Sequence, residues 1–298
     1  MDLDIASRTL GFVGLGNMGF LMARRLREHG FRLIVHDARS EAVHRFQAEF
    51  DTRAASGRRD LAAQSDILIL MLPDGGVVRD FLLTNRDDDE APARHLRPGS
   101  IVIDMSSSDP AGTQELGAEL RKRDIELVDA PVSGGVMRAR NGTLAIIVGG
   151  DERVAASLWP LFSAMGSSIL PVGPLGAGHA MKALNNYVSA AGLVAACEAV
   201  LVARKFGIRG ETALQVLNSS TGKNNSTENK IAQFVLSQKF DSGFALGLMR
   251  KDLATAGHLA RHLKMRLPLA DNLLQVWEEG EKTLGANADH TEIARLVT

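Results

Sequence analysis

The sequence predicts an α/β domain built on a mostly parallel sheet, followed by an all-α domain, with one long helix joining the two. Three observations support this prediction. The first half alternates short apolar runs with helical patterns, the alternation stops near Gly173, and a long helical pattern begins directly afterwards. The 298 residues suffice for about two domains. We expect the first domain at residues 1–173 and the second at 174–298, with 174–206 as the interdomain helix.

The strands of the first domain follow from near-continuous apolar runs, which are typical of parallel strands buried on both faces. Such runs occupy residues 10–15, 32–37, 67–72, 101–105, 125–128 and 144–148. Helical patterns separate them, the first at residues 18–29, where Gly30 stops it. Alternating strands and helices predict a parallel sheet with helices on both faces.

The second domain follows from helical periodicity, because no β-rich run is evident after Gly173. Residues 179–206 form one long, Ala-rich pattern whose middle is thin enough for another helix to approach closely. Shorter helical patterns occupy residues 211–217, 229–236, 246–263 and 269–284. This half is therefore predicted to be all-helical.

Composition argues against several kinds of partner. The formal net charge is −1 without a basic cluster, so neither nucleic acid nor an anionic membrane is expected as the main partner. The apolar stretch Ala183–Cys197 contains Asn185 and Asn186 and is shorter than the roughly 18 residues that suggest a membrane span. The polar segment at residues 84–95, with its acidic run at 87–90, is interpreted as a solvated surface loop, not a metal site.

The cysteine and histidine content limits the kinds of metal site and disulfide that the protein can form and indicates its cellular compartment. Cys197 is the only cysteine, which excludes an internal disulfide and a cysteine metal cluster and fits a reducing compartment. No secretory signal is visible before Arg8, so a cytoplasmic protein is expected. The eight histidines show no metal-ligand pattern, and no metal is predicted.

A cofactor site is predicted where the first strand ends. The segment Gly14-Leu15-Gly16-Asn17-Met18-Gly19 reads G-x-G-x-x-G between a strand and a helix, and Asp37 ends the next strand. In this context the glycines permit a tight turn, close approach of backbone N–H groups to a pyrophosphate, and close packing of helix on strand. Asp37 would accept hydrogen bonds from ribose hydroxyls and repel a 2′-phosphate. This favours NAD, although nearby Arg39 could tolerate the phosphate of NADP. Alternatively, the glycines could form an ordinary tight turn between strand and helix, and Asp37 could be a turn residue at the end of a strand.

Three later strand exits carry candidate ligand-binding groups, because ligands sit at the carboxyl ends of strands in open parallel sheets. Leu72-Pro73 ends one run, and Ser106–Ser108 follows another. The serines could equally cap a helix ahead of Pro110. The segment Ser133-Gly134-Gly135 exposes backbone N–H groups that suit a carboxylate, or is a glycine-rich loop without a ligand.

Lys182 stands where the glycine-rich turn at residues 173–178 runs into the long helix. No carboxylate lies three or four residues away on either side, and Asn186 follows one turn later on the same face. Lys182 could cover apolar surface with its stem while its ammonium reaches water. Alternatively, a partly desolvated amine could exchange protons near neutral pH. The cofactor and carboxylate motifs favour the second interpretation.

Together these segments resemble the β-hydroxyacid dehydrogenase family, of the 3-hydroxyisobutyrate dehydrogenase type. The matching segments run in family order over nearly the whole chain: 11–19, 129–135, 142–144, 173–186 and 251–253. The resemblance implies a Rossmann-type domain and a helical C-terminal domain like that of 6-phosphogluconate dehydrogenase. It also implies NAD(P)-linked oxidation of a short, anionic 3-hydroxy acid or reduction of its semialdehyde. A homodimer or homotetramer packed through the helical domains is implied as well.

The resemblance also implies roles for individual residues. Lys182 looks like the catalytic lysine and Asn186 like the partner that holds substrate and orients the amine. The family's carboxylate-binding loop corresponds to Ser133, Gly134 and Gly135, and its cofactor contacts to Leu72, Pro73, Val77, Ser107 and Lys251. Lys251 could instead cap the start of a helix, and a structural role is expected for His179.

The chemistry fits these assignments. Hydride leaves the carbinol carbon for the nicotinamide, so the protein must accept the hydroxyl proton, or return one during reduction. A lysine whose pKa lies near the working pH serves both directions, and its ammonium stabilises a developing alkoxide.

Two features depart from the family pattern. Arg138 brings a guanidinium near the carboxylate loop, which could favour a substrate with a second anionic group, or it points to solvent. Lys223-Asn224-Asn225-Ser226 is predicted to be a polar loop that could line the substrate pocket of a polyhydroxylated acid.

Other functions remain open at this point. An imine reductase on the same architecture usually carries another residue at the lysine position. A 6-phosphogluconate-type enzyme would need a much longer helical domain. A non-catalytic dinucleotide-binding scaffold would be expected to lack Lys182. The presence of Lys182 and Asn186 therefore favours the dehydrogenase.

Overall fold

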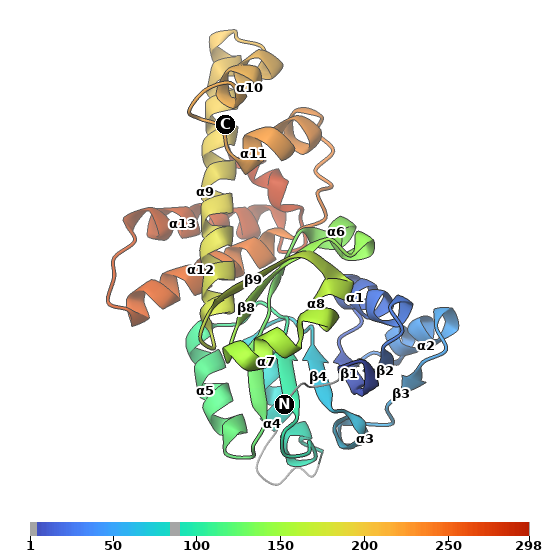
Figure 1. The fold of residues 1–298 in the computed structure, drawn as a ribbon. Helices are drawn as coiled ribbons and strands as arrows, with labels where there is room; N and C mark the ends of the chain where they lie inside the picture. Colours follow the sequence, from blue (N-terminus) through green and yellow to red (C-terminus); the bar gives the residue numbers. More distant parts are fainter. Residues whose placement is uncertain (1–4, 84–89, 298) are drawn as a thin grey trace. The chain divides into compact units, whose positions relative to one another are not determined.

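The computed structural model describes residues 5–83 and 90–297 and divides into two compact units, 1–182 and 183–298 (Figure 1). The first unit is α/β and the second is helical, as predicted. The predicted domain boundary at residue 173 falls at the end of the last strand, four residues before the long helix begins. Of the solvated loop expected at residues 84–95, residues 84–89 lie outside the described residues. The remainder is not wholly solvated, because Pro92–Arg94 form the short helix η2 and Ala91 and Ala93 are each only 2% exposed.

Nine strands form the sheet of the first unit: β1 Thr9–Val13, β2 Arg32–His36, β3 Arg53–Ala54, β4 Ile67–Leu70, β5 Ile101–Asp104, β6 Glu126–Asp129, β7 Val132–Ser133, β8 Leu144–Gly149 and β9 Gly166–Gly173. The order is β3-β2-β1-β4-β5-β6-β8-β7, with β9 pairing to β8. All pairs are parallel except β6 with β8 and β7 with β8. The strand order reverses between β1 and β4, so a crevice for ligand is expected beyond their carboxyl ends.

The helices of the first unit connect these strands. They are η1 Ile5–Ser7, α1 Asn17–Glu28, α2 Ser40–Glu49, α3 Arg58–Gln64, α4 Gly75–Leu83, η2 Pro92–Arg94, α5 Pro110–Arg121, α6 Gly135–Asn141, α7 Glu152–Ser157 and α8 Trp159–Met165. The first predicted helix, residues 18–29, is thus confirmed to within one residue at each end.

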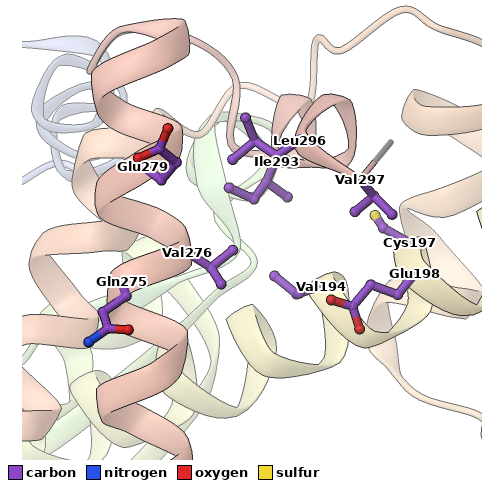
Figure 2. A pocket seen from close by; sticks show the side chains of 9 residues that line it. All are labelled: Val194, Cys197, Glu198, Gln275, Val276, Glu279, Ile293, Leu296 and Val297. Carbon is purple, nitrogen blue, oxygen red and sulfur yellow. The ribbon is translucent and has the colours of Figure 1, made fainter.

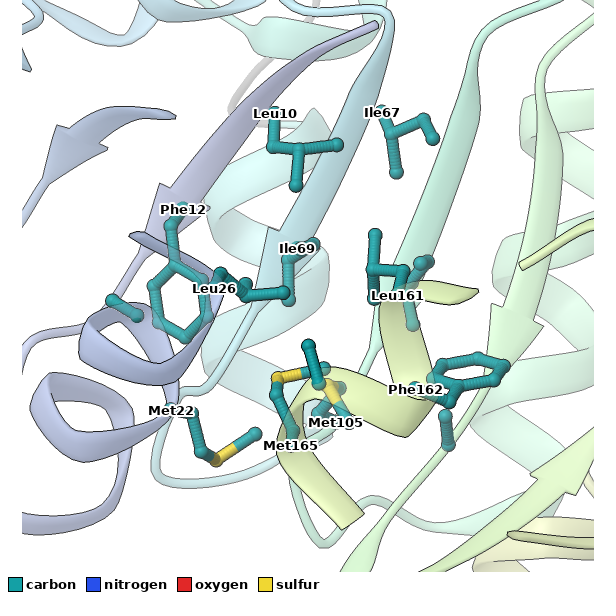
Figure 3. Packing of buried hydrophobic residues seen from close by; sticks show 14 of the residues in the cluster. Leu10, Phe12, Met22, Leu26, Ile67, Ile69, Met105, Leu161, Phe162 and Met165 are labelled. Atoms are coloured by element: carbon teal, nitrogen blue, oxygen red, sulfur yellow. The ribbon is translucent and has the colours of Figure 1, made fainter. Parts of the chain in front are cut away.

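The central strands are buried on both faces, as their apolar runs predict. Alternate residues of one strand enter opposite cores: Phe12 packs with Met22 of α1 on one face, whereas Val13 packs on the other. Figure 3 shows the first core, a cluster that includes Leu10 and Ile67 of neighbouring strands and Leu161, Phe162 and Met165 of α8. A parallel strand can satisfy this arrangement only when helices cover both faces.

The strand β9 was not predicted, and neither were the two-residue strands β3 and β7. Seven of the eight β9 residues are partly or fully exposed, and the segment contains Ser167, Ser168 and Pro171. Among the strands that the structure describes, β9 pairs with β8 alone. An edge strand of this kind needs no apolar run, so periodicity does not reveal it.

The second unit consists of helices. The long helix α9 Ala177–Phe206 begins in the first unit and continues into the second, followed by α10 Gly210–Asn218, α11 Asn225–Asn229, η3 Ile231–Leu236, α12 Leu246–His262, α13 Pro268–Leu284 and η4 His290–Leu296. Its core surrounds the fully buried Trp277 and includes Leu193, Met249 and Ile293. The four shorter predicted helices are confirmed, although residues 231–236 form a π-helical turn.

Two expectations for this unit are wrong. Residues 225 and 226 are helical, not part of a loop, because Asn224 caps α11 by accepting hydrogen bonds from the Ser226 and Thr227 amides at 2.8 and 3.1 Å. By length and composition α9 is also long and apolar enough to cross a membrane, with a mean hydropathy of 1.6 over 18 residues, of which 39% are buried. The uncharged stretch considered in the sequence ends at Cys197, before Glu198, whereas a membrane-spanning helix can contain a few charged residues. The core helix of a globular protein passes the same test.

Candidate active site

The glycine-rich loop lies where β1 ends and α1 begins. Gly14 has φ +94°, and a side chain there would overlap the carbonyl oxygen of Met71. A side chain at Gly19 would overlap the carbonyl oxygen of Gly14. These two glycines are therefore required by the protein's own backbone.

Gly16 is different, because a Cβ built on it meets no atom within 4 Å. Its φ of −69° is accessible to any residue. Gly16 is the N-cap of α1 and offers no side chain to the first-turn amides, which leaves a place for an anion at the helix N-terminus. The open space and the amides of Asn17 and Met18 fit the pyrophosphate of a dinucleotide.

Asp37 holds the glycine-rich loop from the end of β2. Its Oδ2 accepts a hydrogen bond from the Leu15 amide at 2.6 Å, and its Oδ1 accepts one from the Arg39 amide at 2.8 Å. The Arg39 side chain is 68% exposed and lies 3.5 Å from the Asp37 carboxylate. Asp37 thus shapes the glycine-rich loop through its hydrogen bond to the Leu15 amide, a structural contribution that the sequence motif alone did not reveal.

A hydrogen bond connects the segments that follow β4 and β5. The Leu72 amide donates to Ser106 Oγ at 3.0 Å, whereas Ser108 Oγ donates inward to Asp104 Oδ2 at 2.7 Å. Ser106 and Ser108 are buried, and Ser107 between them is partly exposed. Ser107 is therefore the serine of this trio with accessible surface. The N-cap of α5 is Asp109, which accepts from the Gly112 amide, so the alternative of a serine cap is wrong.

The remaining predicted cofactor contacts come from two places. Pro73 is exposed and Val77 is 40% exposed, in the turn and first residues of α4. Lys251 is partly buried on α12, in the interior of a helix that begins at Leu246. The alternative that Lys251 caps a helix start is therefore wrong.

The predicted carboxylate loop follows β7. Gly134 and Gly135 adopt φ values of +131° and +66°, a backbone conformation that favours glycine at both positions. The Arg138 stem covers Gly134, with Cδ and Cβ 2.5 and 2.8 Å from the place a Cβ would occupy. Gly135 faces open space. The stem of the exposed Arg138 side chain therefore packs against Gly134 of the loop.

Lys182 and Asn186 lie one turn apart on α9, and both are buried, with 7% and 6% of their surfaces exposed. Burial of Lys182 disfavours the interpretation in which its ammonium simply extends into water. Asn186 Nδ2 donates to Asp252 Oδ2 at 2.5 Å, which orients the amide. Asp252 was not predicted as a site residue, although it follows Lys251 in the segment that resembles the family.

A pocket of about 540 Å³ occurs elsewhere, in the second unit (Figure 2). Its lining comes from α9, α13 and the C-terminal segment: Val194, Cys197, Glu198, Gln275, Val276, Glu279, Ile293, Leu296 and Val297. None of the predicted site residues belongs to it. Burial raises the pKa of the Cys197 thiol to about 12, so this cysteine is an inert packing group. Among residues 5–83 and 90–297 no group of three potential metal ligands occurs.

Comparison with known proteins finds a match to a dehydrogenase domain for each half of the chain. Residues 9–173 match the NAD-binding domain of 6-phosphogluconate dehydrogenase, and residues 176–297 match the NAD-binding region of NADP-dependent 3-hydroxyisobutyrate dehydrogenase. The chain is 33% identical to 2-(hydroxymethyl)glutarate dehydrogenase of Eubacterium barkeri, over 91% of this chain and 88% of that protein. It is 31% identical to the NAD-dependent L-serine dehydrogenase of Pseudomonas aeruginosa, over 97% of each.

Solved structures of dehydrogenases share the fold of this chain. A 3-hydroxyisobutyrate dehydrogenase of Mycobacterium tuberculosis, solved with L-serine, superposes with a TM-score of 0.89 at 28% identity, covering 97% of this chain and 99% of that one. An imine reductase of Myxococcus stipitatus superposes with a TM-score of 0.66 at 19% identity, covering 98% of this chain and 100% of that one, which shows a shared fold alone.

Proposed function

This chain belongs to the β-hydroxyacid dehydrogenase family, and within it we propose that Lys182 handles the proton while NAD(P) exchanges hydride with a short 3-hydroxy acid. The chain is an NAD(P)-dependent hydroxyacid dehydrogenase. The observation that carries the proposal is the burial of Lys182 on the first turns of α9, in the unit that also holds the glycine-rich loop and the Ser133–Gly135 turn.

The residues divide the work of the reaction. The amides of the Ser133–Gly135 turn bind the substrate carboxylate, and Lys182 Nζ accepts the hydroxyl proton as the C–H bond gives up hydride. In the reverse direction the ammonium returns that proton and stabilises the alkoxide. The nicotinamide supplies the hydride acceptor when bound. Asn186, oriented by Asp252, holds the hydroxyl group within reach of the amine.

The groups that follow β1 and β4 would bind the cofactor. The first-turn amides of α1 hold the pyrophosphate, and Asp37 meets the adenosine ribose, which favours NAD. Leu72, Pro73, Val77 and Ser107 follow the carboxyl ends of β4 and β5 on the same sheet and would contact the cofactor there.

Replacing Lys182 with alanine tests the central role. We expect kcat to fall about 10²- to 10⁴-fold, the usual contribution of a general acid or base, while the Kd for NADH stays within about threefold, because the glycine-rich loop is untouched. Steady-state kinetics and NADH fluorescence titration measure both. Lys205→Ala, which removes an exposed lysine from the same helix, is the matched control. Unchanged turnover in Lys182→Ala would remove the amine from the mechanism.

The position of Arg138 supports the proposal that the substrate carries a second anionic group. Its stem rests on Gly134, so its guanidinium is tethered beside the carboxylate loop, and one relative is named for a dicarboxylate, 2-(hydroxymethyl)glutarate. Arg138→Ala should lower kcat/KM for dianionic hydroxy acids at least tenfold and change kcat/KM for 3-hydroxyisobutyrate or serine less than threefold. Arg140→Ala, on the same helix, is the control. Equal losses for both substrate classes would contradict this role.

Assembly and location complete the proposal. We propose a homodimer or homotetramer built through the helical units, supported by apolar side chains of α9 with large exposed fractions: Val188 and Val202 at 66% and Phe206 at 84%. The single, buried Cys197 supports work in the reducing cytoplasm.

A further inference from the structure

We propose that His179, Asp129 and Asp104 form a buried positioning cluster. This cluster holds Lys182 at a defined position relative to the Ser133–Gly135 turn and to the loops that follow β4 and β5. The proposal rests on the proposed role of Lys182. All three residues are at most 1% exposed, and all lie in the first unit. They are absent from the residues predicted for substrate or cofactor, and they act on the reaction only through the groups they hold.

Asp129 connects the carboxylate loop to the start of α9. Its Oδ1 accepts a hydrogen bond from the Gly176 amide at 2.8 Å, and its Oδ2 accepts one from the His179 amide at 2.7 Å. A carboxylate from another element thus accepts from the amide just before this 30-residue helix and from one amide of its first turn. Asp129 is also four residues before Ser133 in the same segment, so one side chain fixes Lys182 relative to the turn that binds the substrate.

The His179 ring connects the same helix to α5 and to the β5 exit. Nε2 lies 3.1 Å from the Ser106 carbonyl oxygen, which can only accept, so Nε2 carries hydrogen. Nδ1 lies 2.8 Å from Thr113 Oγ1. The ring sits between two carboxylates, 3.7 Å from Asp129 Oδ2 and 3.7 Å from Asp104 Oδ2. Both ring nitrogens are therefore engaged, which fixes the orientation of the imidazole.

Asp104 and Ser106 extend the cluster to the loops on the cofactor side. Asp104 Oδ1 accepts from the Ser106 amide at 2.9 Å and Oδ2 accepts from Ser108 Oγ, which turns these two serines inward and leaves Ser107 with accessible surface. Ser106 Oγ in turn accepts from the Leu72 amide. A chain of hydrogen bonds thus runs from the β4 exit through β5 and His179 to α9.

Packing leaves the start of α9 little freedom to shift. A Cβ on Gly178 would lie 2.5 Å from the Ile147 carbonyl oxygen and 2.8 Å from Asp129 Oδ2. A Cβ on Gly149 would lie 2.5 Å from Asp129 Oδ1 and 2.8 Å from the Gly178 amide nitrogen. Two glycines are thus required so that helix, strand and carboxylate can meet. Lys182 follows His179 by three residues, so a displacement at His179 reaches the amine directly. A misplacement of about 1 Å can cost about 10²-fold in rate.

Thr113 gives the sharpest test, because valine has the shape of threonine without its hydroxyl. Thr113→Val removes the partner of His179 Nδ1, whereas Thr113→Ser keeps it. We expect Thr113→Val to lower kcat about tenfold, with the KM for substrate and the Kd for NADH changed less than threefold, and Thr113→Ser to restore kcat to within twofold of wild type. Rates are normalised to sites titrated with NADH, so that loss of folded protein is not counted. Ser157→Ala, which removes a hydroxyl elsewhere in the unit, should leave kcat unchanged.

A double-mutant cycle with Lys182→Ala separates this proposal from the catalytic role itself. If the cluster acts through Lys182, Thr113→Val should lower kcat in the wild-type background and produce no further loss in the Lys182→Ala background. Equal losses in both backgrounds would overturn positioning of Lys182, as would a lowered Tm with unchanged kcat per titrated site. If Lys182→Ala alone leaves turnover unchanged, the proposed function fails instead, and the Thr113 pair still reports whether the cluster affects the rate.

Discussion

At the residue scale, the two functions of glycine in the cofactor loop can be separated. Gly14 and Gly19 are required by nearby carbonyl oxygens, whereas the Cα of Gly16 faces open space. The pattern G-x-G-x-x-G identified all three positions from the sequence. It could not say which of them serve the protein and which serves the ligand, because that depends on Met71 and on the approach of α1.

This difference predicts opposite outcomes for two alanine variants. Gly16→Ala should leave the free energy of unfolding within about 0.5 kcal/mol and raise the Kd for NADH at least tenfold, because the methyl group occupies pyrophosphate space. Gly19→Ala should lower the free energy of unfolding by about 1–3 kcal/mol through overpacking. Urea unfolding and NADH titration measure the two quantities. A Gly16→Ala protein that binds NADH normally would contradict the assignment of that space.

At the element scale, helices and central strands were predicted well, and edge strands and short capped helices were not. The central strands carry six apolar runs because they are buried on both faces. By contrast β9 is mostly exposed, and α11 depends on the Asn224 cap instead of on periodicity. The C-terminal η4 was missed for the same reason: its Asp289 cap binds Ser242 Oγ at 2.7 Å across 47 residues.

The attachment of η4 predicts acid sensitivity. Burial, reinforced by the nearby Lys230 ammonium, lowers the pKa of His290 to about 4. An unfolded histidine titrates near 6.5, so between pH 6.5 and 4 the unfolded chain binds more protons and stability falls as pH falls. From pH 7 to pH 5 this amounts to about 2 kcal/mol.

His290→Gln should remove this dependence. Urea unfolding at pH 7 and pH 5 should show wild type losing about 2 kcal/mol more than the variant over that interval. His44→Gln, which replaces an exposed histidine, should lose as much as wild type. Equal losses in wild type and His290→Gln would show that the buried imidazole does not control the acid response.

At the scale of the whole molecule, each half belongs to a different fold class. The first unit places the glycine-rich loop, Ser107, the Ser133–Gly135 turn and Lys182 along the carboxyl ends of one sheet and the helix that follows it. The second unit orients Asn186 through Asp252. Length and composition alone do not distinguish α9 from a membrane span.

The sequence by itself determined the α/β and helical halves, the dinucleotide loop and the candidates Lys182, Asn186 and Ser133–Gly135. These are local patterns, in which residues near one another in the chain reveal both structure and chemistry. Only the tertiary structure decided how the candidates are held. Asp129 binds the amides of Gly176, just before α9, and His179, in its first turn, across 47 and 50 residues, and His179 meets Ser106 across 73. Buried polar groups must find partners wherever the fold brings them, so no pattern of spacing could identify the cluster that fixes Lys182.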